Sequence, residues 1–297
     1  MKHAYLITAH DSPELLQRLL KALDDERNDI YIHLDRKCHL DVSCLKMEKS
    51  ILYILPERIS VYWGDVSQIK AQLLLIGEML PHGPYAYCHL LSGSDFPIKS
   101  QNYIHAQCEL LAGKEFIGYA HEEYLDVEIS RKVRHYHLYP HYFRNGNLWR
   151  RAFRYLFLQV QYGLKYERNK QILFKKGSIL CSITYDFARY VYQRRNQIIK
   201  TYGHTFCADE IFLQTACWDS RFKKNIYCLD DEFAGCLRYI KWHDHAIQAI
   251  PENEIQEMIN SDRWFARKFS ESQLGLVDTI AERLNIPDDR FLLSANV

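Results

Sequence analysis

The segment HAYLITAHDSPELLQRLLKALDDERNDIYIHLD, residues 3–35, predicts a strand, a loop, a helix and a second strand. Tyr5 to Thr8 and Ile30 to Leu34 are short apolar runs of strand length. Ser12 and Pro13 are typical of an N-cap and a first helical position. Between Pro13 and the run that begins at Ile30, apolar residues recur at helical spacing. These residues are Leu15, Leu16, Leu19, Leu20 and Leu23.

The same alternation continues through the first 120 residues. Ile51 to Leu55 predicts a strand, Ser67 to Leu80 a helix, and Tyr85 to Leu91 a buried strand. Such alternation predicts an α/β fold with a mostly parallel central sheet and helices on both faces. Ligands of such sheets bind beyond the carboxyl ends of the strands. Those ends carry His10, Asp35, Trp63-Gly64 and the run Ser92 to Asp95, so polar residues gather there.

The overall composition excludes several classes of protein. A net charge of +1 over 297 residues argues against a generic nucleic-acid binder, because such binding scales with the number of phosphates neutralised. The sequence contains no run of about 20 apolar residues and no signal-peptide pattern, so we expect a cytoplasmic protein. Nine cysteines without a Cys-x-x-Cys pair favour buried small hydrophobes over disulfides or zinc.

Residues 131–176 differ from the rest of the chain. They hold twelve Lys or Arg residues against a single acid, a net charge of +11, interleaved with aromatic residues. Residues 147–163 predict an amphipathic helix, which could hold anionic lipid headgroups or pack on the domain with its Arg face in water. Three nearby histidines without carboxylate or Cys neighbours favour solvated or acceptor-contacting side chains over a metal site. They are His135, His137 and His141.

Seven short segments follow one another in an order typical of a single enzyme family. They are Ala4–His10, Ile32–Lys37, Val61–Ser67, Leu90–Lys99, Lys176–Ser178, Ala208–Glu210 and Phe265–Phe269. In these segments the chain resembles the core-2/I-branching N-acetylglucosaminyltransferase and peptide xylosyltransferase family, glycosyltransferase family 14, as a bacterial member. The resemblance implies a GT-A-type, Rossmann-like nucleotide-sugar fold, a UDP-sugar donor, inversion at the anomeric carbon and no metal cofactor.

Positive charge at the donor has to come from side chains if no metal is bound. Metal-dependent enzymes of this fold type use an Asp-x-Asp motif, and the sequence contains none. The resemblance implies that Arg238 and Lys268 hold the donor diphosphate, as fixed cations replacing a Lewis acid. It also implies that Glu210 is the base that takes the acceptor's proton. Asp209, just before it, is expected to cap a helix over Asp209–Cys217.

The remaining expected site residues divide between donor and acceptor. Asp35 can accept hydrogen bonds from uracil or ribose, Gly93 permits close approach of a ligand, and Asp95 could cap a turn. Related sequences often have Gln-Trp where this chain has Ile179-Leu180, so the acceptor's identity does not transfer. Donor-binding candidates are His10, Asp35, Trp63, Ser92, Gly93 and Asp95; acceptor-binding candidates are Arg131, Arg134, Ser178 and Asp209.

The predicted organisation is one GT-A-type domain over 1–297. Residues 1–120 would bind the nucleotide sugar, 121–270 would form the acceptor and catalytic half, and 271–297 a helical extension. The expected partners are a UDP-sugar and a carbohydrate or lipid-linked glycan acceptor in bacterial surface polysaccharide assembly, with no nucleic acid. Peripheral contact with an anionic membrane is one interpretation of the basic segment.

Two other functions compete with transfer. A nucleotide-sugar-binding protein without transfer activity would need no usable base, so Glu210 counts against it. A hydrolase of glycosidic bonds would need two carboxylates flanking the bond, and a single one lies in a recognisable motif.

Overall fold

A five-stranded sheet forms the centre of the computed structural model, which describes residues 1–43, 45–121, 123, 125–143, 146–243 and 246–284. The strand order is β3-β2-β1-β4-β6, and all neighbours are parallel except the antiparallel pair β4 and β6. The predicted α/β class with a mostly parallel sheet is therefore confirmed. The strands are β1 His3–Ala9, β2 Asn28–Leu34, β3 Ile51–Ile54, β4 Tyr87–Ser92 and β6 Ser182–Thr184.

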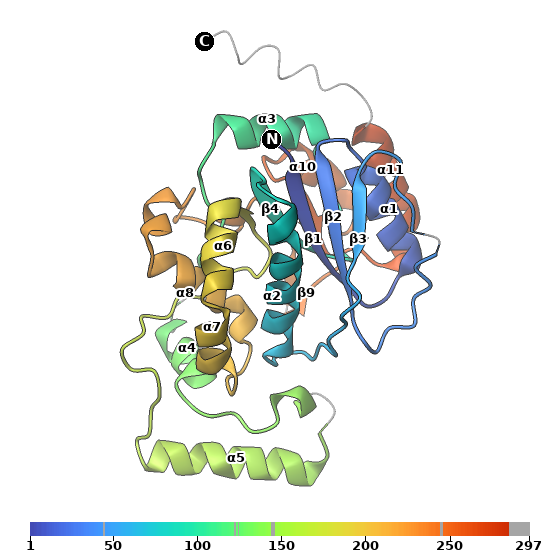
Figure 1. The fold of residues 1–297 in the computed structure, drawn as a ribbon. Helices are drawn as coiled ribbons and strands as arrows, with labels where there is room; N and C mark the ends of the chain where they lie inside the picture. The colour runs from blue at the N-terminus through green and yellow to red at the C-terminus, as the bar shows by residue number, and fades with distance from the viewer. Residues whose placement is uncertain (44, 122, 124, 144–145, 244–245, 285–297) are drawn as a thin grey trace.

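Helices cover both faces of this sheet, as the alternation predicted (Figure 1). Side chains of β1 alternate between two apolar cores, with Leu6 on one side and Tyr5 and Ile7 on the other. The Leu6 side packs under α2 Ser67–Met79, α6 Tyr185–Gln193, α7 Arg195–Tyr202 and α8 Phe212–Trp218. The opposite side packs under α1 Pro13–Leu23, α10 Ile255–Asn260 and α11 Leu274–Leu284.

A smaller sheet lies beside the first. Its order is β5-β10-β7, from Phe96–Pro97, Phe265–Arg267 and Arg238–Ile240, and a hairpin joins β8 Trp242–His243 to β9 Ala246–Ile247. The remaining helices are α3 Gln101–Leu110, α4 Leu125–Val133, α5 Leu148–Gly163 and α9 Glu232–Cys236. Short 3-10 turns are η1 Leu80–His82, η2 Pro140–Tyr142, η3 Ala208–Glu210, η4 Arg221–Asn225, η5 Glu252–Glu254 and η6 Glu271–Gln273.

Three local predictions are corrected. The helix expected over 186–197 is split at Arg194 into α6 and α7. The strand expected over 178–184 is confined to Ser182–Thr184, because the Ser178 hydroxyl and the main chain of Leu180 close a turn before it. Ser12 holds the N-cap position of α1, but its side chain makes no capping hydrogen bond.

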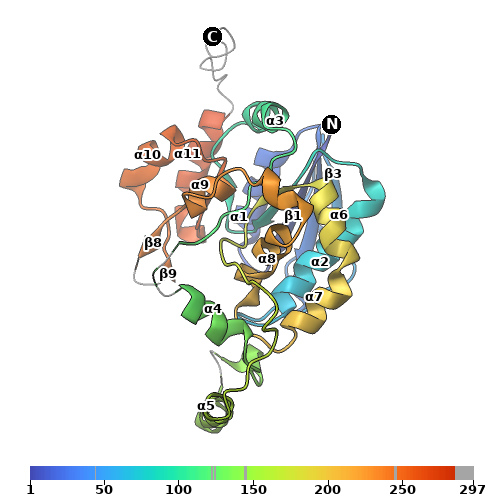
Figure 2. The ribbon, with the colours of Figure 1, turned by 90° about the vertical axis from the view of Figure 1, so that its left-hand side faces the viewer.

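Helix α5 lies apart from the sheet, at one end of the molecule (Figure 1), and Figure 2 shows it end-on below the body. Within the described residues, no helix combines the length and apolarity needed to span a membrane. The predicted C-terminal helix is confirmed as α11, while residues 285–297 of the expected extension lie outside the described residues. The division of the chain into two halves stays a prediction.

Candidate active site

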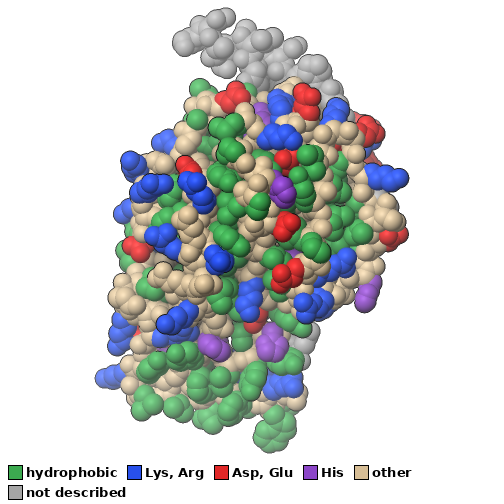
Figure 3. All heavy atoms as spheres, viewed as in Figure 1, with side chains coloured by type: hydrophobic (Ala, Val, Ile, Leu, Met, Phe, Trp, Pro, Cys, Tyr) green, Lys and Arg blue, Asp and Glu red, His purple; other side chains and the backbone are tan. Residues whose placement is uncertain are grey.

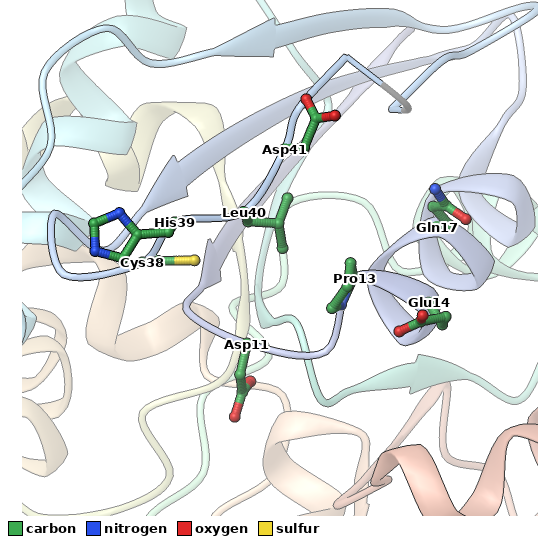
Figure 4. A pocket seen from close by; sticks show the side chains of 8 residues that line it. All are labelled: Asp11, Pro13, Glu14, Gln17, Cys38, His39, Leu40 and Asp41. Carbon is green, nitrogen blue, oxygen red and sulfur yellow. The ribbon is translucent and has the colours of Figure 1, made fainter.

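A hollow of about 510 Å³ opens between the loops that follow β1 and β2 (Figure 4). Asp11 lies on the first loop, Glu14 and Gln17 on the first turns of α1, and His39 and Asp41 on the second loop. Carboxylates and an amide can accept hydrogen bonds from the N–H and O–H groups of a nucleoside, whereas the carboxylates repel phosphate. These lining residues were missed by the sequence analysis, although they adjoin His10 and Asp35 at strand ends.

Asp35 shapes the second loop. Its buried carboxylate accepts hydrogen bonds from the backbone N–H groups of Lys37, at 2.8 Å, and Val61, at 3.3 Å, and lies 3.2 Å from the Lys37 ammonium. His10 is exposed and lies 3.3 Å from Asp11. Both candidates thus flank the hollow without belonging to its lining side chains.

The Ser92–Asp95 loop is a tight turn at the end of β4. The buried Asp95 carboxylate accepts the Ser92 N–H at 2.6 Å, which is the capping role expected of it. A Cβ atom at Gly93 would lie 3.2 Å from the Ala9 Cβ, so close packing against β1 favours glycine there. Burial raises the pKa of Asp95 despite Arg267, whose Nε lies 3.5 Å from its carboxylate. Asp95 therefore supports the loop from within.

Lys268 follows β10 and lies beside that loop. The backbone N–H of Phe269 donates to the Ser94 carbonyl at 3.0 Å, which joins the two segments. The Lys268 side chain is exposed, and no ion pair joins it to another described residue. Its place beside the loop is compatible with the role expected at the diphosphate.

Arg238 does not have the accessible position that its expected role requires. Its side chain is 1% exposed and donates to the carbonyls of Cys236, at 2.9 Å, and Cys181, at 3.0 Å, and to the Ser182 hydroxyl at 3.1 Å. It also lies over the Phe265 ring at 4.4 Å. Burial lowers the pKa of Arg238. The structure therefore contradicts a diphosphate contact for Arg238 and gives it a role in joining the two sheets.

Arg238→Met should accordingly lower stability and leave donor affinity intact. The methionine fills part of the space but leaves buried carbonyl groups without a donor, at about 1–3 kcal/mol for each unsatisfied group. We expect a loss of about 3–5 kcal/mol in the free energy of unfolding, measured by urea denaturation. A folded variant of normal stability with much weaker UDP binding would restore the diphosphate role.

Glu210 belongs to a chain of alternating charges. Its carboxylate lies 3.0 Å from the Lys132 ammonium, which also lies 2.7 Å from Glu128, and Glu128 lies 3.1 Å from Lys176. The Glu210 side chain is 33% exposed. Burial alone would lower the pKa of Lys132, but Glu210 and Glu128 outweigh it and raise that pKa. The ion pair with Lys132 therefore holds the Glu210 carboxylate in place while leaving it accessible.

Asp209 is buried instead of capping a helix. Helix α8 begins at Phe212 with Ile211 at the N-cap position, so the expected capping role is wrong. The Asp209 carboxylate accepts a hydrogen bond from Gln68 at 2.9 Å, and burial, with the charge of Glu210, raises its pKa to about 7. The same burial keeps it from the acceptor contact that was expected.

Trp63 lies next to the Glu210 segment. The Cys207 N–H donates to the Gly64 carbonyl at 3.0 Å, which ties the Trp63 loop to the residues preceding Glu210. Gly64 has a φ of 72°, and a Cβ there would lie 2.6 Å from the Phe206 ring. Trp63 is 43% exposed and packs edge-on against Phe206. A ring half in solvent can still pack on a sugar.

The acceptor candidates differ in how accessible they are. Arg131 is exposed at the end of α4, but Arg134 donates to the carbonyls of Asn169 and Ile172 at 3.0 and 3.2 Å and so supports the chain after α5. His135 and His137 are buried, which corrects the expectation of solvated or acceptor-contacting side chains.

In the described part of the chain, one group of side chains is close enough to share a cation, and it lies in the core. His3, His89 and Cys108 bring ligand atoms within 4.8 Å of one another. The two imidazoles already share a hydrogen bond at 3.0 Å, and burial holds the pKa of His3 at about 2. Packing therefore accounts for the group, which lies at the amino ends of the strands, away from the hollow.

The hollow at the strand ends, the accessible Glu210 carboxylate and the exposed Lys268 are features expected of an α/β enzyme that acts on a nucleotide-linked substrate. The Core-2/I-Branching enzyme model matches residues 3–262, and the chain belongs to that family.

Relatives of this chain are named glycosyltransferases. N-acetyllactosaminide beta-1,6-N-acetylglucosaminyl-transferase of Mus musculus is 24% identical over 90% of this chain and 68% of its own length. Xylosyltransferase 2 of Canis lupus familiaris is 27% identical over 38% of this chain and 14% of its own length. The apo crystal structure of mouse xyloside xylosyltransferase 1 is 12% identical, with a TM-score of 0.37 over 89% of this chain and 97% of that one. That score is too low to support an argument.

Proposed function

We propose that this chain is an inverting, metal-independent glycosyltransferase that moves a sugar such as GlcNAc or xylose from a UDP-sugar to an acceptor hydroxyl. The observation that carries this proposal is the Glu210 carboxylate, which is accessible and lies 3.0 Å from the Lys132 ammonium. Family membership supports sugar transfer as the reaction. The hollow beside the sheet is lined by hydrogen-bonding side chains, which supports binding of the donor through its nucleoside.

The chemistry is a single displacement. Glu210 accepts the proton of the acceptor hydroxyl while that oxygen forms a bond to the anomeric carbon from the face opposite the leaving group. The bond from the anomeric carbon to the diphosphate oxygen breaks, and UDP leaves with the electron pair. One displacement inverts the anomeric configuration. Lys132 remains paired with Glu128 after Glu210 is neutralised, so its charge is not left unpartnered.

Lys268 would stabilise the charge that develops on the departing UDP. Its ammonium, on the segment whose main chain is bonded to the Ser94 loop, supplies this charge without coordination chemistry. The acidic hollow would take the uracil and ribose, since its carboxylates would repel the phosphates. The acceptor would be a carbohydrate or lipid-linked glycan of a bacterial surface polysaccharide, and the enzyme would work in the cytoplasm or at the inner face of the plasma membrane.

Donor binding and turnover should survive metal removal. A panel of UDP-GlcNAc, UDP-xylose and UDP-galactose, screened by thermal shift, identifies the donor because a ligand that binds the native state stabilises it. Release of UDP from that donor, with an acceptor hydroxyl, should proceed at the same rate in EDTA. Loss of turnover in EDTA that manganese restores would refute metal independence and leave transfer itself standing.

A further inference from the structure

Helix α5 turns its apolar side away from the protein. Trp149, Phe153, Leu156 and Val160 follow one another at helical spacing, and their exposed fractions are 84, 56, 60 and 50%. Leu148 is 80% exposed beside them. Figure 3 shows hydrophobic side chains along this lower edge of the molecule. A soluble surface helix normally buries such a stripe.

The side of the same helix that faces the body is mixed, with Arg154, Phe157 and Leu158 partly buried and Gln161 buried. The buried Gln161 side chain exchanges two hydrogen bonds with the Tyr136 main chain, at 2.8 and 2.9 Å. The guanidinium groups of Arg150 and Arg154 lie over the rings of Tyr142 and Phe143, at 4.1 and 4.7 Å. The expected packed helix with its Arg face in water is met in part: Arg151 is exposed, whereas Arg154 packs against the body, and an apolar stripe also lies in solvent.

We propose that α5 lies in the interface of an anionic membrane, with its apolar stripe (Trp149, Phe153, Leu156 and Val160) inserted among the lipid chains. The helix has 16 residues, about 24 Å at 1.5 Å per residue, and no described helix can span a bilayer, so the contact is in the plane of the surface. This inference does not rest on the proposed transfer reaction.

The positive charge around α5 favours anionic lipid over a second copy of the chain as the partner that covers the apolar stripe. The segment around α5, residues 131–176, has a net charge of +11, so two copies meeting through α5 would bring like charges together. Anionic headgroups would neutralise those charges of the segment that are exposed, such as Arg151 and Lys165. An amphipathic helix with Trp on its apolar side is typical of membrane interfaces.

The carboxyl ends of the parallel strands point toward the end of the molecule where α4 and α5 lie (Figure 1). Insertion of the stripe would bring that end, and with it the candidate site, close to the membrane surface. A lipid-linked acceptor would then meet the site by diffusion in two dimensions.

The test is flotation of the full chain with phosphatidylglycerol–phosphatidylcholine vesicles. We expect Phe153→Gln with Leu156→Gln to weaken binding by about 10- to 100-fold, since two apolar side chains no longer leave water. Tm should stay unchanged, because both side chains are exposed. Arg151→Gln with Lys165→Gln, the matched control on the charged side, should weaken binding less and mainly at low salt.

Trp149 gives a second readout. Vesicles should shift its emission to the blue, and Trp149→Phe should bind similarly but lose the shift. Equal binding by the Phe153/Leu156 double variant and the wild type, or equal binding to pure phosphatidylcholine, would overturn the proposal. Concentration-dependent dimers without vesicle binding, abolished by the same double variant, would make a second copy the occupant and overturn it as well.

Discussion

Glu210→Gln should lower turnover by about 100- to 10,000-fold while UDP affinity stays nearly unchanged. The amide keeps the shape of the side chain and its 33% exposure but cannot accept the acceptor's proton. The donor hollow is built from the loops after β1 and β2, so UDP binding should not sense the change. Single-turnover transfer and UDP titration measure the two effects separately.

The matched control is Glu128→Gln. It removes the other carboxylate that contacts Lys132, at 2.7 Å, but leaves Glu210 in place. Lys132 then keeps Glu210 as its partner, so we expect a much smaller loss of turnover. Near-normal turnover in Glu210→Gln would show that another group accepts the proton.

Lys268→Met should lower turnover by about 100- to 1,000-fold and weaken UDP. The Lys268 ammonium would stabilise charge that develops on the leaving diphosphate, and loss of one such group costs this much in comparable sites. Tm should not change, because the side chain is exposed and its segment is held by the main-chain bond from Phe269 to Ser94.

Two further variants test whether the effect comes from the positive charge at position 268. Lys268→Arg keeps the charge and should recover part of the turnover. Lys241→Met removes a lysine whose ammonium is occupied by Glu254 at 2.6 Å, and should leave both turnover and UDP affinity intact. Unchanged UDP affinity and turnover in Lys268→Met would exclude this lysine from the diphosphate site.

Arg238 and Lys268 show where reasoning from motifs reaches its limit. Both are basic residues in the later part of the chain, and the motifs alone treat them alike. The partners of Arg238 are carbonyl and hydroxyl groups near residues 181, 182 and 236, brought together when β4, β6 and β7 assemble. Main-chain acceptors exist at every residue, so nothing in the sequence marks the ones that will surround a buried guanidinium.

Helix α5 shows the same limit at the level of a whole element. Its spacing predicted an amphipathic helix over residues 147–163, and the structure has one at Leu148–Gly163. Hydrophobic periodicity shows that the two faces of a helix differ in polarity, but it does not determine which face packs against the rest of the protein. That choice depends on the Tyr136 main chain and the rings of Tyr142 and Phe143.

The sequence by itself determined the α/β class, the strands β1 to β4, the helices α1 and α2, and the family, because apolar periodicity and short ordered motifs are local properties. Tertiary structure alone decided the pairing of Glu210 with Lys132, the burial of Asp209 and Arg238, and the outward apolar face of α5. Each of these depends on contacts between residues far apart in the chain, and their electrostatic and desolvation energies exist only once the surrounding groups are in place.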